Sequence, residues 1–217
     1  MATYSSDLMS YKVPFRGNVD GQETQVTGTI VVKEGTKLTD GDFLKFLRIG
    51  QHQALRSFTL SVDGELDDGT VALAGTVGYF QALGPDGNAL VVDDKTGTTY
   101  TSPASNTDAL VAADNTELIR VLQAQGPATA TFRAGDDTAD NTYEADGATL
   151  GSKGLEGPVD LGIEITATAN GDAAADVTIR FTATLIRRNA TQGEFSGELA
   201  SAYSNRYTGN SSGGLVS

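Results

Sequence analysis

The chain of 217 residues contains no cysteine and no tryptophan, and it has a single histidine, His52. Without cysteine there is no disulfide framework, no thiol nucleophile and no cysteine-type zinc site. A Ser-His-Asp triad is recognised by its geometry, and the residues around His52 give no reason to expect one. We therefore expect His52 at a turn or at a strand end rather than in a catalytic site.

Long apolar runs are also missing. No stretch approaches the roughly 18 apolar residues of a membrane-spanning helix, so no membrane contact is expected. Residues 1–10 are polar apart from Leu8 and Met9, and they lack the basic segment and apolar run of a secretory signal. We accordingly interpret the glycosylation-type triplets at Asn189 and Asn210 as chance matches.

Positive charge is scarce. The chain has 28 Asp and Glu against 15 Lys and Arg, a formal net charge of -13 at pH 7, and the acidic residues are spread along its whole length. Binding to nucleic acid depends mainly on clustered Lys and Arg that neutralise phosphates. The composition therefore predicts a well-solvated surface that does not bind nucleic acid.

Two runs of alternating apolar and polar residues are the clearest pattern in the chain. Positions 159–167 and 177–185 each carry an apolar residue at every second place, and Asn170-Gly171-Asp172 lies between the runs. Successive side chains of a strand point to opposite faces, so this alternation indicates strands with one buried face. We predict a β-hairpin formed by these two strands.

Similar alternation predicts strands at 24–32, 58–62, 71–79 and 128–132. The strands 58–62 and 71–79 are expected to be neighbours, joined by the acidic link 64–69. Residues 41–50 fit either a short helix or a strand, and the flanking glycines and aromatic content favour a strand.

A turn and a helix complete the pattern. Gly84-Pro85-Asp86-Gly87 predicts a turn with antiparallel flanks, followed by short strands near 90–92 and 98–101. Between 108 and 125 the spacing of apolar residues predicts a helix, with Asp114 or Thr116 as its N-cap and Gly126-Pro127 as its stop. One short helix in a β protein typically covers an edge or an open end.

These elements predict an all-β fold: an antiparallel β-sandwich or a jelly-roll-like barrel with one short helix and extended terminal arms. We divide the chain into an N-terminal arm (1–16), a body (17–188) with an acidic loop at 134–155, and a polar C-terminal tail (189–217). The apolar residues of the arm must be covered either by the body or by a neighbouring molecule, and we expect the neighbour.

Two groups of acidic residues resemble calcium loops. They are Asp63, Glu65, Asp67 and Asp68 in one group, and Asp136, Asp137, Asp140 and Glu144 in the other. Neither meets the EF-hand template, which needs glycine at position six and Glu at position twelve. Solvated turns are the expectation, and a looser surface calcium site stays open. Since no pair of carboxylates is singled out for acid–base chemistry, we expect neither an enzyme nor a cofactor.

The order of these features resembles the capsid decoration, or cement, proteins of tailed bacteriophages. The similar parts are the short aromatic arm, the strand Val26-Thr27-Gly28-Thr29-Ile30-Val31-Val32, the Gly-Asp segment with its apolar strand at 41–49, the strand, acidic link and strand at 58–80, and the paired runs at 159–185. The resemblance covers residues 10–188 and consists of patterns of size and polarity. The Ser- and Gly-rich tail from Asn189 departs from the compact ending of that family.

The resemblance implies a non-enzymatic virion protein on the outer capsid surface. Such a protein is expected to form a homotrimer and to stabilise the capsid by bridging neighbouring subunits of the major capsid protein. We expect the contacts to be made by Tyr4, Leu8, Met9, Tyr11, Phe15, Arg16, Phe195, Tyr203 and Tyr207. The alternatives are a glycan- or receptor-binding module of a phage fibre and another virion component such as a tail-tube protein. A hydrolase that uses scattered carboxylates has the least support.

Overall fold

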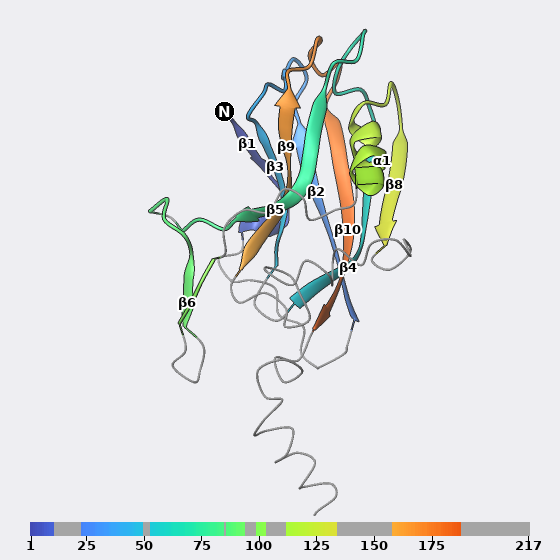
Figure 1. Cartoon of the computed structure of the whole chain (residues 1–217). Helices are drawn as coiled ribbons and strands as arrows, with labels where there is room; N and C mark the ends of the chain where they lie inside the picture. The colour runs from blue at the N-terminus through green and yellow to red at the C-terminus, as the bar shows by residue number, and fades with distance from the viewer. Residues whose placement is uncertain are drawn as a thin grey trace, which may run out of the picture.

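The computed structural model describes residues 1–10, 23–49, 53–84, 86–93, 99–102, 112–133 and 158–187. Its strands form two four-stranded sheets that face each other (Figure 1). Sheet A has the order β1-β3-β9-β5 and is made of β1 (Thr3–Ser5), β3 (Phe43–Ile49), β9 (Val159–Ala167) and β5 (Ala74–Gln81). Sheet B has the order β2-β10-β4-β8 and is made of β2 (Glu23–Val32), β10 (Val177–Arg187), β4 (Gln53–Val62) and β8 (Ala128–Arg133). The fold is therefore the predicted β-sandwich, and the two sheets do not close into a barrel.

The predicted strands are present, but two of the predicted pairings are wrong. β9 and β10 were expected to form a hairpin, yet β9 pairs with β3 and β5 in sheet A, whereas β10 pairs with β2 and β4 in sheet B. β4 and β5 also lie in different sheets. Alternation shows that a strand has one buried face. The same alternation is expected whether the next strand in the sequence pairs with it or lies in the opposite sheet.

The core between the sheets is built from the inward positions of these strands. Phe46 of β3 packs against Phe58 and Phe181 of the opposite sheet, with ring centroids 5.3 Å apart in each case. Phe181 also lies over Gly28, its cross-strand partner in β2, where a Cβ atom would come within 2.7 Å of the ring. The aromatic cluster therefore requires glycine at position 28.

The helix α1 (Ala112–Leu122) closes one side of the sandwich. Leu118 and Leu122 are buried in the core, and the Asn115 side chain accepts a hydrogen bond from the Val77 backbone N–H on β5, the edge strand of sheet A. The helix ends before Gly126, as predicted. The predicted N-cap is wrong, because the helix already begins at Ala112 and Thr116 lies in its second turn.

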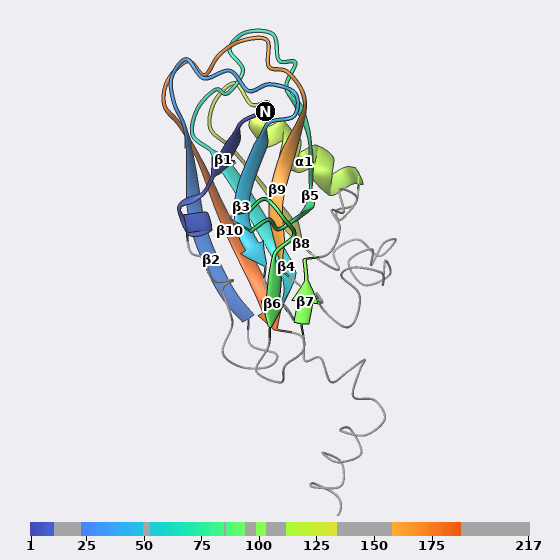
Figure 2. The same ribbon diagram turned by 90° about the vertical axis from the view of Figure 1, so that its left-hand side faces the viewer.

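The N-terminal residues close the other side (Figure 2). β1 pairs with β3 in parallel, the one parallel pairing among the described strands, and the short 3-10 helix η1 (Asp7–Ser10) follows. Tyr4 and Leu8 pack against the core, and the Asp7 carboxylate accepts a hydrogen bond from the Thr29 N–H of β2 (2.9 Å). Over residues 1–10 the predicted arm is thus packed on the body of its own subunit, and residues 11–16 lie outside the described part.

A small hairpin stands on the outer side of sheet A (Figures 1 and 2). β6 (Val91–Asp93) and β7 (Thr99–Thr101) pair antiparallel. The preceding turn is confirmed, because Gly87 N–H donates to Gly84 C=O, Gly87 has φ 77°, and Leu83 and Ala89 form an antiparallel bridge. The buried Ser102 holds the base of the hairpin, since its hydroxyl accepts from Ala82 N–H and donates to Pro158 C=O.

The loops at one end of the sandwich are hydrogen-bonded to each other. Residues 33–42, which link β2 to β3, form backbone hydrogen bonds with residues 165–173, which comprise the end of β9 and the first part of the β9–β10 link. Among them are Gly35 N–H to Ala173 C=O (2.9 Å) and Ala169 N–H to Leu38 C=O (2.9 Å). The β4–β5 link joins them through Asn170, whose amide donates to Thr70 C=O. Connections between the two sheets are therefore fixed at this end by backbone contacts as well as by the core.

Candidate functional site

The outer face of sheet B is a polar surface to which all four of its strands contribute. We call it the threonine face, and define it by the outward side chains of its four strands: Gln25, Thr27, Thr29 and Val31 of β2, Thr178, Arg180, Thr182 and Thr184 of β10, Arg56, Ser57, Thr59 and Ser61 of β4, and Thr129 and Thr131 of β8. The inward positions of the same strands form the core, so the outward set follows from strand alternation. None of the described helices or strands covers this face.

A row of four threonines crosses the threonine face. Thr27, Thr182, Thr59 and Thr131 are successive cross-strand partners, one from each strand. The hydroxyls of Thr27 and Thr182 are 3.2 Å apart, and those of Thr59 and Thr131 are 2.9 Å apart, so they hydrogen-bond in pairs. Paired threonines on a strand are stiff, because branching at Cβ restricts χ1 and the hydroxyl bond fixes it further.

The described charged side chains of the threonine face are both cations, in a chain that is strongly acidic: Arg180 in the middle of β10 and the exposed Arg56 at the bulge of β4. Arg180 stands in the interior of the face, next to Thr29 on one side and Ser61 on the other. Its guanidinium lies 3.8 Å from the carboxylate of Asp63, which follows β4 and accepts a 2.6 Å hydrogen bond from Thr178 N–H. The Arg180 side chain remains 59% exposed, so it is accessible to a carboxylate of a partner.

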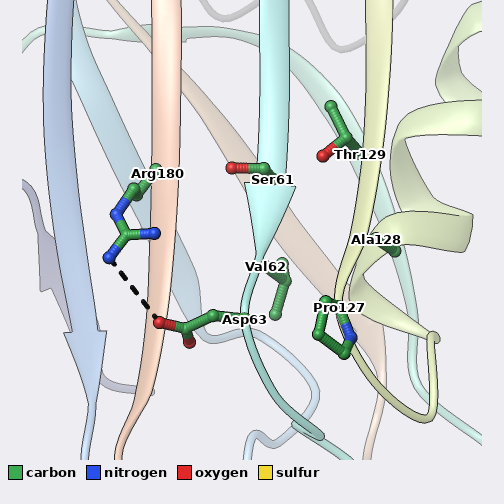
Figure 3. Close-up of a pocket in the computed structure, with 7 residues that line it drawn as sticks. All are labelled: Ser61, Val62, Asp63, Pro127, Ala128, Thr129 and Arg180. Carbon is green, nitrogen blue, oxygen red and sulfur yellow. Dashed lines mark ion pairs between the residues drawn. The ribbon is translucent and has the colours of Figure 1, made fainter.

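A shallow pocket of about 290 Å³ lies at one end of the threonine face. It is lined by Ser61, Val62, Asp63, Pro127, Ala128, Thr129 and Arg180. Figure 3 shows Arg180, Ser61 and Thr129 side by side on β10, β4 and β8, with the Arg180–Asp63 ion pair at the rim. The lining offers hydroxyls and one cation but no activated nucleophile beside a base, which suits contact with a polar group rather than a reaction.

The outer face of sheet A has a different character. Its Asp160 is fully buried, and the carboxylate accepts hydrogen bonds from Arg48 Nε (2.7 Å), Arg48 NH2 (3.1 Å) and Lys45 Nζ (3.2 Å). Beside this cluster, Phe43 and Phe80 meet edge to face with centroids 4.9 Å apart. Both oxygens of Asp160 are matched by cations, so the cluster serves to hold β9 against β3.

The acidic residues of the first calcium-like group do not converge. Asp67 is buried and points into the loops: its Oδ2 accepts from Ala72 N–H (2.7 Å) and Leu73 N–H (2.9 Å), and its Oδ1 from Gly171 N–H (2.8 Å). Burial opposes ionisation of Asp67, but these backbone donors outweigh it and lower the pKa of the carboxyl below its ordinary value. Asp68, by contrast, is exposed.

The backbone approaches closely at the same place. A Cβ on Gly171 would lie 2.2 Å from the Asp68 carbonyl oxygen, so only glycine lets the β9–β10 loop reach Asp67. Within the described residues no group of three or more His, Asp or Glu could hold a metal ion. The second acidic group, at 136–144, and His52 lie outside the described residues.

Asp42 has a related role near the N-terminus. Its buried carboxylate accepts hydrogen bonds from Ala2 N–H, Thr39 N–H and the Thr39 hydroxyl. Burial raises the pKa of Asp42, yet these donors prevail and lower it overall. Asp42 and Asp67 are therefore structural carboxylates that tie chain segments together.

Of the nine predicted contact residues, the structure describes three. Tyr4 and Leu8 pack against the core of their own subunit, and Met9 is half-buried in η1. The other six, Tyr11, Phe15, Arg16, Phe195, Tyr203 and Tyr207, lie outside the described residues. The threonine face was missed, although the sequence shows Thr at alternate positions of the runs 27–29 and 129–131, and Thr, Arg, Thr and Thr at alternate positions of 178–184.

Comparison with known proteins finds similarity in structure but none in sequence families. The sequence matches no protein-family model and no curated protein. The structure is similar to a chain in "Capsid of Ralstonia phage GP4", with a TM-score of 0.50 and 15% sequence identity over 86% of this chain and 99% of that one. It also matches a chain in "Cyanophage Pam1 capsid asymmetric unit", with a TM-score of 0.40 and 14% identity over 82% of this chain and 94% of that one. At this identity the GP4 likeness shows a shared fold.

Among the described residues, no helix is both long enough and apolar enough to cross a membrane.

Proposed function

We propose that this chain is a structural protein of a phage virion. In this proposal it binds the outer surface of the capsid and stabilises the shell by bridging neighbouring subunits of the major capsid protein, and it carries out no reaction. The observation that carries the proposal is the sandwich shared with the chain from the GP4 capsid, a likeness that extends over 99% of that chain. The acidic composition suits an outward position, away from packaged nucleic acid.

The start of β2 and the end of β10 lie together at one end of sheet B. Ile186 near the end of β10 is the cross-strand partner of Glu23 at the start of β2. The six candidate contact residues outside the described part belong to residues 11–22, which precede β2 in the sequence, and to residues 188–217, which follow β10. Tyr4 and Leu8 instead hold the N-terminal strand to the core, so their substitution would act on folding first.

A trimer would strengthen such attachment. A protein that binds only the assembled shell stabilises it by mass action, and three linked sites bind more tightly than one without any new type of contact. Light scattering of the purified chain should then give three times the 22.5 kDa mass of one copy. A monomer at the concentrations of the binding experiment would count against the trimer.

The proposal is tested with the phage that encodes the chain. The chain should be found in purified particles, and recombinant chain added to shells stripped of it should bind saturably and raise the temperature at which the shells break. Absence from the particles together with no binding to the shells would refute the proposal. Binding of a saccharide on a glycan array without binding to shells would favour the fibre module, and hexameric rings would favour a tail-tube component.

A further inference from the structure

We infer that the threonine face is the surface that meets the coat subunit, and that the coat surface opposite it is polar and places a carboxylate at Arg180. The inference rests on the proposed function and adds to it the face and the chemistry of the contact. It differs from contact through the terminal segments alone, because the threonine face belongs to the rigid body of the sandwich.

The size of the face fits a folded protein partner. Strands lie about 4.8 Å apart and rise about 3.3 Å per residue, so four strands of six to eleven residues present roughly 19 Å by 30 Å, or about 600 Å². A standard protein–protein interface buries about 800 Å² on each partner. The threonine face therefore provides most of an interface of standard size, far more than a single side chain or a short peptide would cover.

The charge of the face selects the partner. The whole chain has a net charge of -13, but none of the outward residues that define the threonine face is acidic. Another acidic protein is therefore repelled least from this direction. Arg180 is the cation in the middle of the face, its side chain is mostly exposed, and its guanidinium has a planar set of donors that fits a carboxylate. Its neighbour Asp63 lies 3.8 Å away, beyond hydrogen-bond distance, which leaves Arg180 able to change partners.

The stiffness of the face lowers the cost of docking. Long flexible side chains lose rotamer freedom at an interface, at a cost of about 0.5–1.5 kcal/mol each. The threonine row has short, branched side chains whose hydroxyls are already paired across the strands. Such a surface can be covered with little ordering and with few hydroxyls left without a partner.

The test compares variants of the full chain in binding to shells stripped of the wild-type chain. Thr182→Glu places a carboxylate in the middle of the threonine row, and Arg180→Glu reverses the charge in the middle of the face. Arg180→Ala is a milder variant at an exposed side chain. Thr70→Glu is the matched control, because Thr70 is exposed in the β4–β5 link and is not part of a strand of sheet B. Circular dichroism and thermal melts establish that each variant is folded.

We expect at least a tenfold rise in Kd for Thr182→Glu and Arg180→Glu, a smaller rise for Arg180→Ala, and a change of less than twofold for Thr70→Glu. Wild-type affinity in both glutamate variants of the face would overturn the inference, and so would an equal loss in the Thr70→Glu control. If the wild-type chain itself does not bind, the proposed function has failed instead, so the two failures are distinguishable.

Discussion

Replacing Asp67 by asparagine should destabilise the fold more than any other change that removes a single charge from the loops. The buried carboxylate accepts hydrogen bonds from Ala72, Leu73 and Gly171, and in this way joins the β4–β5 link to the β9–β10 link. An asparagine of the same shape has one oxygen and one NH₂ group. Whichever way the amide is turned, at least one backbone N–H faces another donor.

The magnitude follows from the number and kind of hydrogen bonds. A hydrogen bond to a charged group contributes about 1.5–3 kcal/mol, and a buried donor left without an acceptor costs about 1–3 kcal/mol. With one bond lost and the others weakened by loss of the charge, we expect the free energy of unfolding to fall by about 3 kcal/mol. For a chain of this size about 1 kcal/mol corresponds to about 2–4 °C, so Tm should fall by about 6–12 °C.

The assay is a urea or thermal melt at pH 7 of the wild type, Asp67→Asn and Asp68→Asn. Asp68 is the matched control because it is the next residue, carries the same charge and is exposed. Its change should alter Tm by no more than about 1–2 °C, as expected for a surface substitution. Equal stability of the two variants would show that the hydrogen bonds of Asp67 add nothing, and the reasoning about this loop would be wrong.

Three further predictions concern stability. The pKa values of Asp42 and Asp67 are lowered in the folded chain, so the stability that the two carboxylates add is complete above the ordinary Asp pKa of about 3.9 and is lost as the pH falls below it. The urea concentration at the unfolding midpoint should therefore decrease as the pH is lowered from 5 to 2.5, and it should decrease less steeply in Asp67→Asn. Asp160→Asn leaves Lys45 and Arg48 without their buried anion and should cost about 3–5 kcal/mol in chemical denaturation; a loss below about 1 kcal/mol would contradict the assigned role. Gly171→Ala places a methyl group against backbone and should cost about 1–3 kcal/mol, measured by the same melts, and a neutral result would mean that the loop moves aside easily.

Strand positions could be predicted from the sequence because burial on one face leaves a period of two. The runs at 159–167 and 177–185 lie within β9 and β10, and Phe43 to Ile49 is a strand, as the flanking glycines indicated. The sequence pattern does not show which other strand a given strand pairs with. β9 and β10 are separated by a link long enough to cross from one sheet to the other, and their apolar positions would be the same in a hairpin.

The start of the helix shows a second limit. Asp114 and Thr116 have the chemistry of N-caps, but α1 begins at Ala112 and its Asn115 binds Val77 N–H on the edge of sheet A. A polar side chain near a helix start can serve the helix or its neighbour, and the sequence does not distinguish the two uses.

The candidate site was predictable in part. The outward threonines follow from the alternation once the strands are known, yet their arrangement in one row depends on register across four strands. The role of Asp67 could not be predicted, because its donor Gly171 is 104 positions away along the chain. Its sequence neighbours Glu65 and Asp68 instead suggested a calcium loop.

The hydrogen-bonded loop end has a mechanical consequence. Two stacked sheets held together by side-chain packing alone can slide past each other, since apolar contacts have little directional preference. Here the backbone of residues 33–42 is bonded to that of residues 165–173, and Asp67 attaches a third link to the same place. A force on sheet B parallel to its plane would therefore be transmitted to sheet A through these hydrogen bonds, and the two sheets would resist sliding as one rigid unit.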